Sequence, residues 1–148
     1  MAIVERPAFA PVVDDADPDD HRPNSRWTGP LADPVSDRYV RDLSVILEHI
    51  GPGDAIPLHR HGVDEVIVVE SGEVELRLGG ETRRVTGRSV AFVPAGVPHG
   101  ARNVGAADAA YTAFFGTTAV DIEYLERNPA PGTEGDPARP PVTYDARA

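Results

Sequence analysis

The feature that most constrains the fold is a series of short apolar or alternating segments between Leu43 and Gly116, each bounded by turn residues. Gly- and Pro-containing turns separate LSVILEHI, AIPLHRH, EVIVVE and EVELRL, and ETRRVTG, SVAFVPAG and YTAFFG follow. Segments of this length and punctuation predict the strands of an all-β sandwich or barrel. Gly79 and Gly80 follow EVELRL and predict a hairpin, because glycine tolerates the positive φ of a tight turn. No stretch keeps a helical period, so we expect at most one short helical turn, over Ile122–Arg127.

The chain has 148 residues, enough to bury a core as one domain. We expect an irregular N-terminal arm over residues 1–42 and a β-barrel over 43–120. Residues 121–148 would hold the short helical turn and an extended, Pro-rich tail, either disordered or lying along the surface. The arm carries four apolar anchors, Phe9, Trp27, Leu31 and Tyr39. Trp27 could close the core, cap one mouth of the barrel or reach a partner subunit.

The formal net charge is −10, which argues against a nucleic-acid partner, because phosphates require a basic surface. Much of this charge lies in the arm, in a segment that we expect to be solvated: Asp14, Asp15, Asp17, Asp19 and Asp20. No run approaches the length of a membrane span, and the first twenty residues lack the pattern of a signal peptide. We therefore expect a soluble cytoplasmic protein without a membrane partner.

Cysteine and lysine are both absent, since all fourteen basic residues are arginine. Disulfides, thiolate ligands, cysteine nucleophiles and Schiff-base lysines are thereby excluded. Proton transfer and metal binding must rely on His, Asp, Glu, Tyr and Arg.

Histidines and one glutamate form the pattern that carries chemistry. His59 and His61 are two residues apart on a predicted strand, so both side chains point to the same face. A turn at residues 62–64 brings the chain back, and Glu65 begins the next predicted strand. His99 follows a second strand and a turn marked by Pro94 and Gly96. We predict that His59, His61, Glu65 and His99 bind one divalent transition metal ion, namely Fe, Mn, Ni, Cu or Zn, because calcium and magnesium prefer all-oxygen ligands.

Both segments resemble the two signature motifs of the cupin superfamily. Gly53, His59, His61, Glu65 and Gly72 fill the first motif, G-x5-H-x-H-x3–4-E-x6-G. Pro94, Gly96, His99 and Asn103 match the second, G-x5-P-x-G-x2-H-x3-N, but Gly87 lies one residue too early. The resemblance covers residues 43–116 and implies a small jelly-roll (double-stranded β-helix) barrel with the metal inside, often as a homodimer.

Four other polar residues are interpreted outside the set of metal ligands. His49 shares a face with Val45 and Leu47; if that face is interior, His49 either orients a ligand or is a hydrogen-bonded core histidine. His21 is expected to be exposed, and Arg60 to form a surface or interface ion pair. Arg77 is expected to face solvent beside Glu75 or Glu81.

The aromatic residues divide between the pocket and ordinary packing. Tyr39, Tyr111 and Tyr124 could line a pocket and donate protons, or simply pack with a hydrogen-bonded hydroxyl. Of these we select Tyr111 as the candidate catalytic residue beside Glu65. Phe92, Phe114 and Phe115 are interpreted as core or pocket wall.

The resemblance implies several activities, because cupins include dioxygenases, isomerases, decarboxylases, lyases, cyclases and binding proteins. The leading hypothesis is a metal-dependent enzyme acting on a small oxygenated metabolite, most simply an iron or manganese dioxygenase. One alternative is a redox-inert, zinc-type cyclase, isomerase or lyase. The other is a non-catalytic cupin that binds a small molecule.

Overall fold

The computed structural model describes residues 2–12, 17–35 and 40–148. These residues form strands and no helix. The strands are β1 (Ala10–Val12), β2 (Arg22–Trp27), β3 (Ser44–Ile50), β4 (Ala55–Arg60), β5 (Glu65–Ser71), β6 (Glu73–Leu78), β7 (Glu81–Thr86), β8 (Ser89–Val93), β9 (His99–Asn103), β10 (Ala109–Phe115), β11 (Ala119–Tyr124) and β12 (Val142–Asp145).

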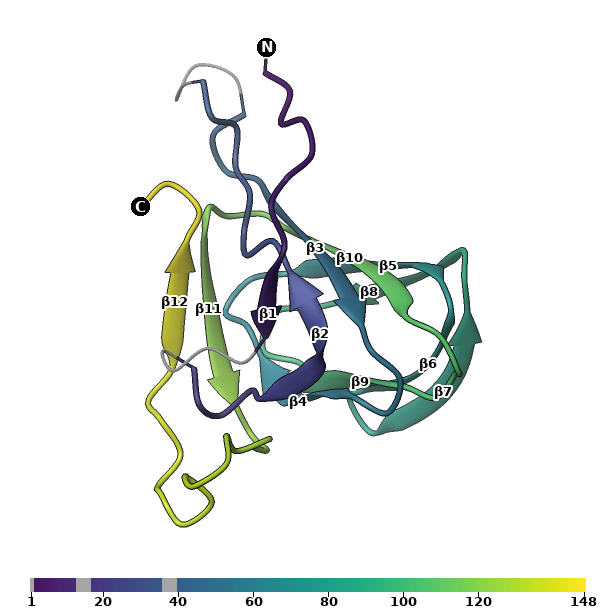
Figure 1. Cartoon of the computed structure of the whole chain (residues 1–148). Helices are drawn as coiled ribbons and strands as arrows, with labels where there is room; N and C mark the ends of the chain where they lie inside the picture. The colour runs from purple at the N-terminus through teal and green to yellow at the C-terminus, as the bar shows by residue number, and fades with distance from the viewer. Residues whose placement is uncertain (1, 13–16, 36–39) are drawn as a thin grey trace.

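The strands build two antiparallel sheets of six strands each (Figure 1). One sheet has the order β1-β2-β3-β10-β5-β8 and the other β12-β11-β4-β9-β6-β7. The chain passes repeatedly from one sheet to the other, as from β3 to β4 and from β4 to β5, which is the connectivity of a jelly roll. The predicted all-β jelly-roll barrel is confirmed. In Figure 1 the β6–β7 hairpin and the β11–β12 pair lie at opposite ends of the molecule.

Side-chain alternation fills the space between the sheets. In β3, Ser44, Ile46, Glu48 and Ile50 are buried while the residues between them are half-buried. The same alternation in β5 and β10 turns Glu65 and Tyr111 inward with the apolar core. The predicted hairpin forms between β6 and β7, with Gly79 at φ 58°. A Cβ atom on Gly72 would lie 2.7 Å from the Cα of Ala109, so only glycine fits where β5 passes into β6.

The N-terminal arm is more ordered than predicted, because it adds two strands to a sheet. β2 pairs with β3 through Arg26 opposite His49 and Trp27 opposite Glu48, and β1 pairs with β2. Trp27 packs against the core and meets the ring of Tyr144 edge-on at 5.2 Å. Trp27 therefore closes the core, which is the first of the three possibilities. Tyr39 lies outside the described residues.

The interpretation of the acidic segment as solvated is wrong for Asp17, Asp19 and Asp20, which are all buried. Asp14 and Asp15 lie outside the described residues. The Asp19 carboxylate is held by distant partners. Asp19 accepts hydrogen bonds from Arg127 Nε at 2.7 Å and from the Arg139 main-chain nitrogen at 2.8 Å. Composition predicted the segment as solvated because all these partners lie more than 100 residues further along the chain.

The predicted helical turn over Ile122–Arg127 is also wrong, since β11 continues to Tyr124. Strand β11 pairs with β4 through Glu123 opposite Arg60, and these two side chains form an ion pair at 2.7 Å. The tail lies along the barrel and contributes β12, which pairs with β11. No described residue belongs to a helix long and apolar enough to cross a membrane.

The outer face of the first sheet is apolar and accessible, which corrects two predictions. Phe92 is 71% exposed and Phe114 is 38% exposed, whereas Phe115 is buried as predicted. His49 also lies on this outer face and contacts the ring of Phe9 at 5.2 Å, so it cannot orient a ligand inside the barrel. Both faces of these strands are apolar in sequence, and alternation alone does not say which face is inside.

Candidate metal centre

Three strands bring the four predicted ligands together. His59 lies on β4 opposite His99, the first residue of β9. His61 follows the end of β4, and Glu65 begins β5. All four side chains are buried, between 2% and 7% exposed. One ligand nitrogen of each histidine lies within 4.8 Å of those of the other two.

A main-chain carbonyl fixes the orientation of each imidazole. His59 Nδ1 lies 2.7 Å from Pro57 O, His99 Nδ1 lies 2.9 Å from Val97 O, and His61 Nδ1 lies 2.5 Å from Asp121 O. A carbonyl oxygen only accepts hydrogen bonds, so each Nδ1 must carry the proton and donate it. Each Nε2 is then left with a lone pair. Hydrogen bonds of this kind orient metal-binding histidines in proteins.

The atoms that face one another are all acceptors. Glu65 Oε2 lies 2.7 Å from His99 Nε2 and 3.4 Å from His61 Nε2. None of these three buried atoms has a hydrogen-bond partner. Burying unpaired acceptors against one another is unfavourable unless a cation or protons lie among them. Three neutral nitrogens and one carboxylate oxygen fit a divalent transition metal ion.

The electrostatics of the metal-free site agree with a cation-binding role. Burial lowers the pKa of His59 well below its ordinary value, and the neighbouring His99 and His61 lower it further, so this imidazole stays neutral. Burial would raise the pKa of Glu65, but hydrogen bonds and charge from the adjacent His61 and His99 outweigh it and hold that pKa at about 2, with protons among the facing atoms in place of a cation. Burial lowers the pKa of His61, but the contact with Glu65 outweighs this and raises it. Glu65 therefore presents a negative charge to the three histidines. A neutral imidazole and an ionised carboxylate are the forms that bind metals.

A cavity of about 50 Å³ adjoins the ligands inside the barrel. Tyr111 lines it, as do Tyr124, Trp27 and Phe115. Burial raises the pKa of Tyr111 well above its ordinary value, and the charges of Glu65 and Glu48 raise it further, so its hydroxyl keeps its proton. The cavity can hold a few water-sized groups, so the enclosed space suits a small ligand.

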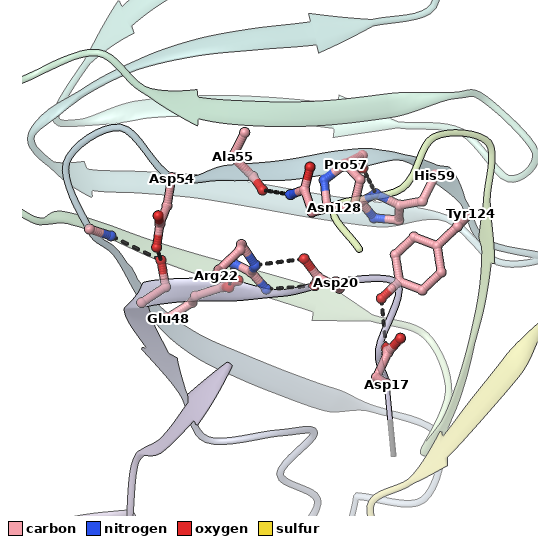
Figure 2. A network of polar contacts seen from close by, with 12 residues as sticks. Asp17, Asp20, Arg22, Glu48, Asp54, Ala55, Pro57, His59, Tyr124 and Asn128 are labelled. Atoms are coloured by element: carbon pink, nitrogen blue, oxygen red, sulfur yellow. Dashed lines mark hydrogen bonds and ion pairs between the residues drawn. The ribbon is translucent and has the colours of Figure 1, made fainter. Parts of the chain in front are cut away.

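Sequence reasoning missed three polar residues that line this cavity: Asp20 and Arg22 from the arm, and Glu48 from β3. Arg22 donates to both oxygens of Asp20 at 2.9 Å, and its Nη1 donates to Glu48 Oε1. Figure 2 shows this cluster in the same interior space as His59 and Tyr124. Glu48 had a detectable signal, because it stands between Ile46 and Ile50 in the alternation of β3. Asp20 and Arg22 had no such signal, because the segment that contains them was predicted to be a polar arm.

The structure also gives the positions of the other polar residues singled out in the sequence. Tyr124 lines the cavity and donates its hydroxyl proton to Asp17 Oδ2 at 2.8 Å, a bond that Figure 2 also draws. Arg77 pairs with Glu126 at 2.6 Å, so the prediction of Glu75 or Glu81 as its partner was wrong. His21 is half-buried, not exposed. The predicted ion pair of Arg60 is confirmed.

Comparison with known proteins agrees with this fold. Residues 46–115 match the family model described as the cupin domain. The H2HPP isomerase of Bacillus subtilis is 36% identical over 63 residues, which cover 42% of this chain and 27% of that protein. This chain thus matches only about a quarter of that curated relative's length.

Solved structures share the fold at low sequence identity. An RmlC-like cupin from Shewanella frigidimarina has a TM-score of 0.57 and 18% identity, and the alignment covers 79% of this chain and 89% of that one. Oxalate oxidase in complex with the substrate analogue glycolate has a TM-score of 0.60 and 22% identity, with 69% and 55% covered. The chain thus resembles cupin proteins in its family-model match over residues 46–115 and in its fold.

Proposed function

We propose that this protein is a metal-dependent enzyme acting on a small oxygenated metabolite, most simply as a dioxygenase. The observation that carries the proposal is the convergence of buried, unpaired acceptors from His61, Glu65 and His99 beside a cavity. His59, His61, Glu65 and His99 would hold one divalent metal ion. When bound, such an ion supplies Lewis acidity or, if it is redox-active, the means to activate dioxygen.

The chain's own residues have defined parts in this proposal. The main-chain carbonyls of Pro57, Val97 and Asp121 hold the imidazoles in the tautomer that leaves Nε2 free. Apolar side chains such as Ile46 and Phe115 form part of the cavity lining, and Tyr111 offers a protonated hydroxyl there. Tyr111 is therefore a candidate proton donor, and Glu65 is first of all a ligand.

Oxygen consumption tests the dioxygenase. Metal-free protein is loaded separately with Fe(II), Mn(II) and Zn(II) and given a panel of enolic and phenolic metabolites in an oxygen-electrode cell. We expect oxygen uptake with Fe(II) or Mn(II), none with Zn(II), and loss of uptake in His99→Ala. His49→Ala is the matched control, because this histidine lies on the outer face and its loss leaves the centre intact. Absence of uptake with every metal and metabolite would exclude the dioxygenase.

A second candidate is a redox-neutral isomerase, cyclase or lyase. It is favoured by the acidic and phenolic side chains on the cavity wall, Glu48 and Tyr111, which are suited to proton transfer. The 36% identity to the H2HPP isomerase is a further reason to test it. Incorporation of solvent deuterium into a substrate by the Zn(II) protein, without oxygen uptake, would identify this class.

We also propose that the protein is a homodimer joined through the outer face of the first sheet. Val66 lies opposite Phe92 on one side and Phe114 on the other, and Phe114 lies opposite Val45. These side chains form an apolar row across four strands, with Phe92 71% exposed. A two-fold axis through the row would place it against itself in a second copy and remove it from water.

A further inference from the structure

Part of the lining of the cavity beside the metal ligands is a cluster of three charged side chains. Asp20, Arg22 and Glu48 are 7%, 3% and 6% exposed, and all three line the cavity. The first two come from the arm and the third from β3. Figure 2 shows Asp20 between Arg22 and the ring of Tyr124. A ligand bound in this cavity beside the metal ligands would therefore also meet these charged groups.

Arg22 is not free to clamp an anionic ligand. Its Nε and Nη2 each donate to one oxygen of Asp20 at 2.9 Å, which uses the planar fork that arginine offers to carboxylates. Its Nη1 donates to Glu48 Oε1. Glu48 Oε2 is the oxygen of this carboxylate left for a ligand, and it is an acceptor.

The charges of the metal ligands and of the cluster balance when a divalent ion is bound. Three neutral histidines, one Glu65 carboxylate and a divalent ion carry a net charge of +1. One arginine and two carboxylates in the cluster carry −1. A neutral ligand keeps this buried space uncharged, whereas an anionic ligand leaves an uncompensated negative charge, which is costly where water is excluded.

Without a cation nearby, burial disfavours the ionised form of both carboxylates of the cluster. Burial raises the pKa of Asp20 and of Glu48, and the ionic contacts to Arg22 oppose this without cancelling it. The single guanidinium thus does not neutralise both carboxylates. A divalent cation nearby would supply the missing positive charge.

We infer that the Asp20–Arg22–Glu48 cluster selects small, neutral, hydroxyl-bearing ligands, such as α-hydroxycarbonyl compounds or diols, and rejects carboxylates of similar size. Glu48 Oε2 accepts the hydrogen bond of a ligand hydroxyl, and Asp20 and Arg22 hold Glu48 in place. The inference rests on the proposed metal-dependent function and narrows its substrate class.

Ligand titrations of the Co(II)-loaded protein test the inference without requiring turnover. The visible absorption of bound Co(II) is followed as hydroxyacetone, a neutral probe, or glycolate, an anionic probe of similar size, is added. The measured quantity is the ratio of the two dissociation constants in the wild type, Glu48→Gln and Asp20→Asn. Glu81→Gln is the matched control, since it removes one negative charge from the exposed β6–β7 hairpin.

We expect Glu48→Gln and Asp20→Asn each to shift the ratio towards glycolate by about tenfold, because each removes a negative charge from the cavity wall. Glu81→Gln should change it less than twofold. Glutamine retains an oxygen that accepts from Arg22, and a thermal melt identifies any variant that does not fold. A shift of at least fivefold in either folded variant supports the inference, and a smaller shift in both overturns it. Failure of the wild type to bind Co(II) contradicts the proposed function instead.

Discussion

His61 Nδ1 lies 2.5 Å from the main-chain oxygen of Asp121, sixty residues further along the chain. The carboxylate of the same Asp121 accepts hydrogen bonds from the Gly62 main-chain nitrogen at 2.8 and 3.0 Å. One residue of β11 thus holds both the imidazole and the turn that follows it. The strand after the cupin-domain match therefore helps to position the candidate metal centre.

Asp121→Ala is expected to weaken metal binding about tenfold, the lower end of what loss of a ligand-orienting contact costs. The side chain anchors the turn that carries His61, and without it the main-chain bond to His61 is less well held. Competition of the protein with a chromophoric chelator measures the effect. Asp145→Ala on β12, which is remote from the histidines, should leave the affinity unchanged. Equal metal affinities for the wild type and Asp121→Ala would show that the Asp121 side chain does not support metal binding.

Arg88→Gly should stabilise the fold by about 1 kcal/mol, since Arg88 adopts φ +69°, a left-handed conformation that disfavours side chains. The second cupin motif requires glycine at this position, and here glycine is displaced to Gly87. Denaturant unfolding measures the change. Arg83→Gly within β7 is the opposite control and should destabilise the protein. A destabilised Arg88→Gly would show that this conformation carries no strain.

Asp19→Asn should lower the free energy of unfolding by about 3 kcal/mol, because it leaves Arg127 without its partner in a buried ion pair. The main-chain hydrogen bond from Arg139 weakens as well. Hydrogen exchange should also become faster at residues 20–22, which Asp19 ties to the tail. Glu134→Gln, an exposed change in the same tail, is the control. An unchanged free energy of unfolding in Asp19→Asn would indicate that this side chain is solvated, as the composition predicted.

Phe92→Arg should convert the proposed dimer into a monomer, since it places a charge on the most exposed side chain of the apolar row, at its β8 end. Light scattering coupled to size exclusion gives the mass directly. Thr82→Arg on β7, in the other sheet, should remain dimeric. A wild type that runs as a monomer at micromolar concentration would contradict the interface.

The sequence predicted the barrel and the convergence of the four candidate ligands because both are encoded locally. Two-residue spacing aligns His59 with His61, and short turns return the chain to Glu65 and bring it to His99. The arm could not be predicted in this way. Asp17 binds the hydroxyls of Tyr124 and Tyr144, 107 and 127 residues away, and an acidic segment with such remote partners looks solvated. Strand β8 has apolar residues on both faces, so nothing local indicated that Phe92 points outward.

The central claim is that His59, His61, Glu65 and His99 form one metal centre. A crystal structure with anomalous diffraction collected at the absorption edges of Fe, Mn, Ni, Cu and Zn tests it most directly. We predict a single anomalous peak among His59 Nε2, His61 Nε2, His99 Nε2 and the Glu65 carboxylate, absent from crystals of His99→Ala. Metal-supplemented wild-type crystals with no peak there, or with the peak held by other residues, would contradict the claim.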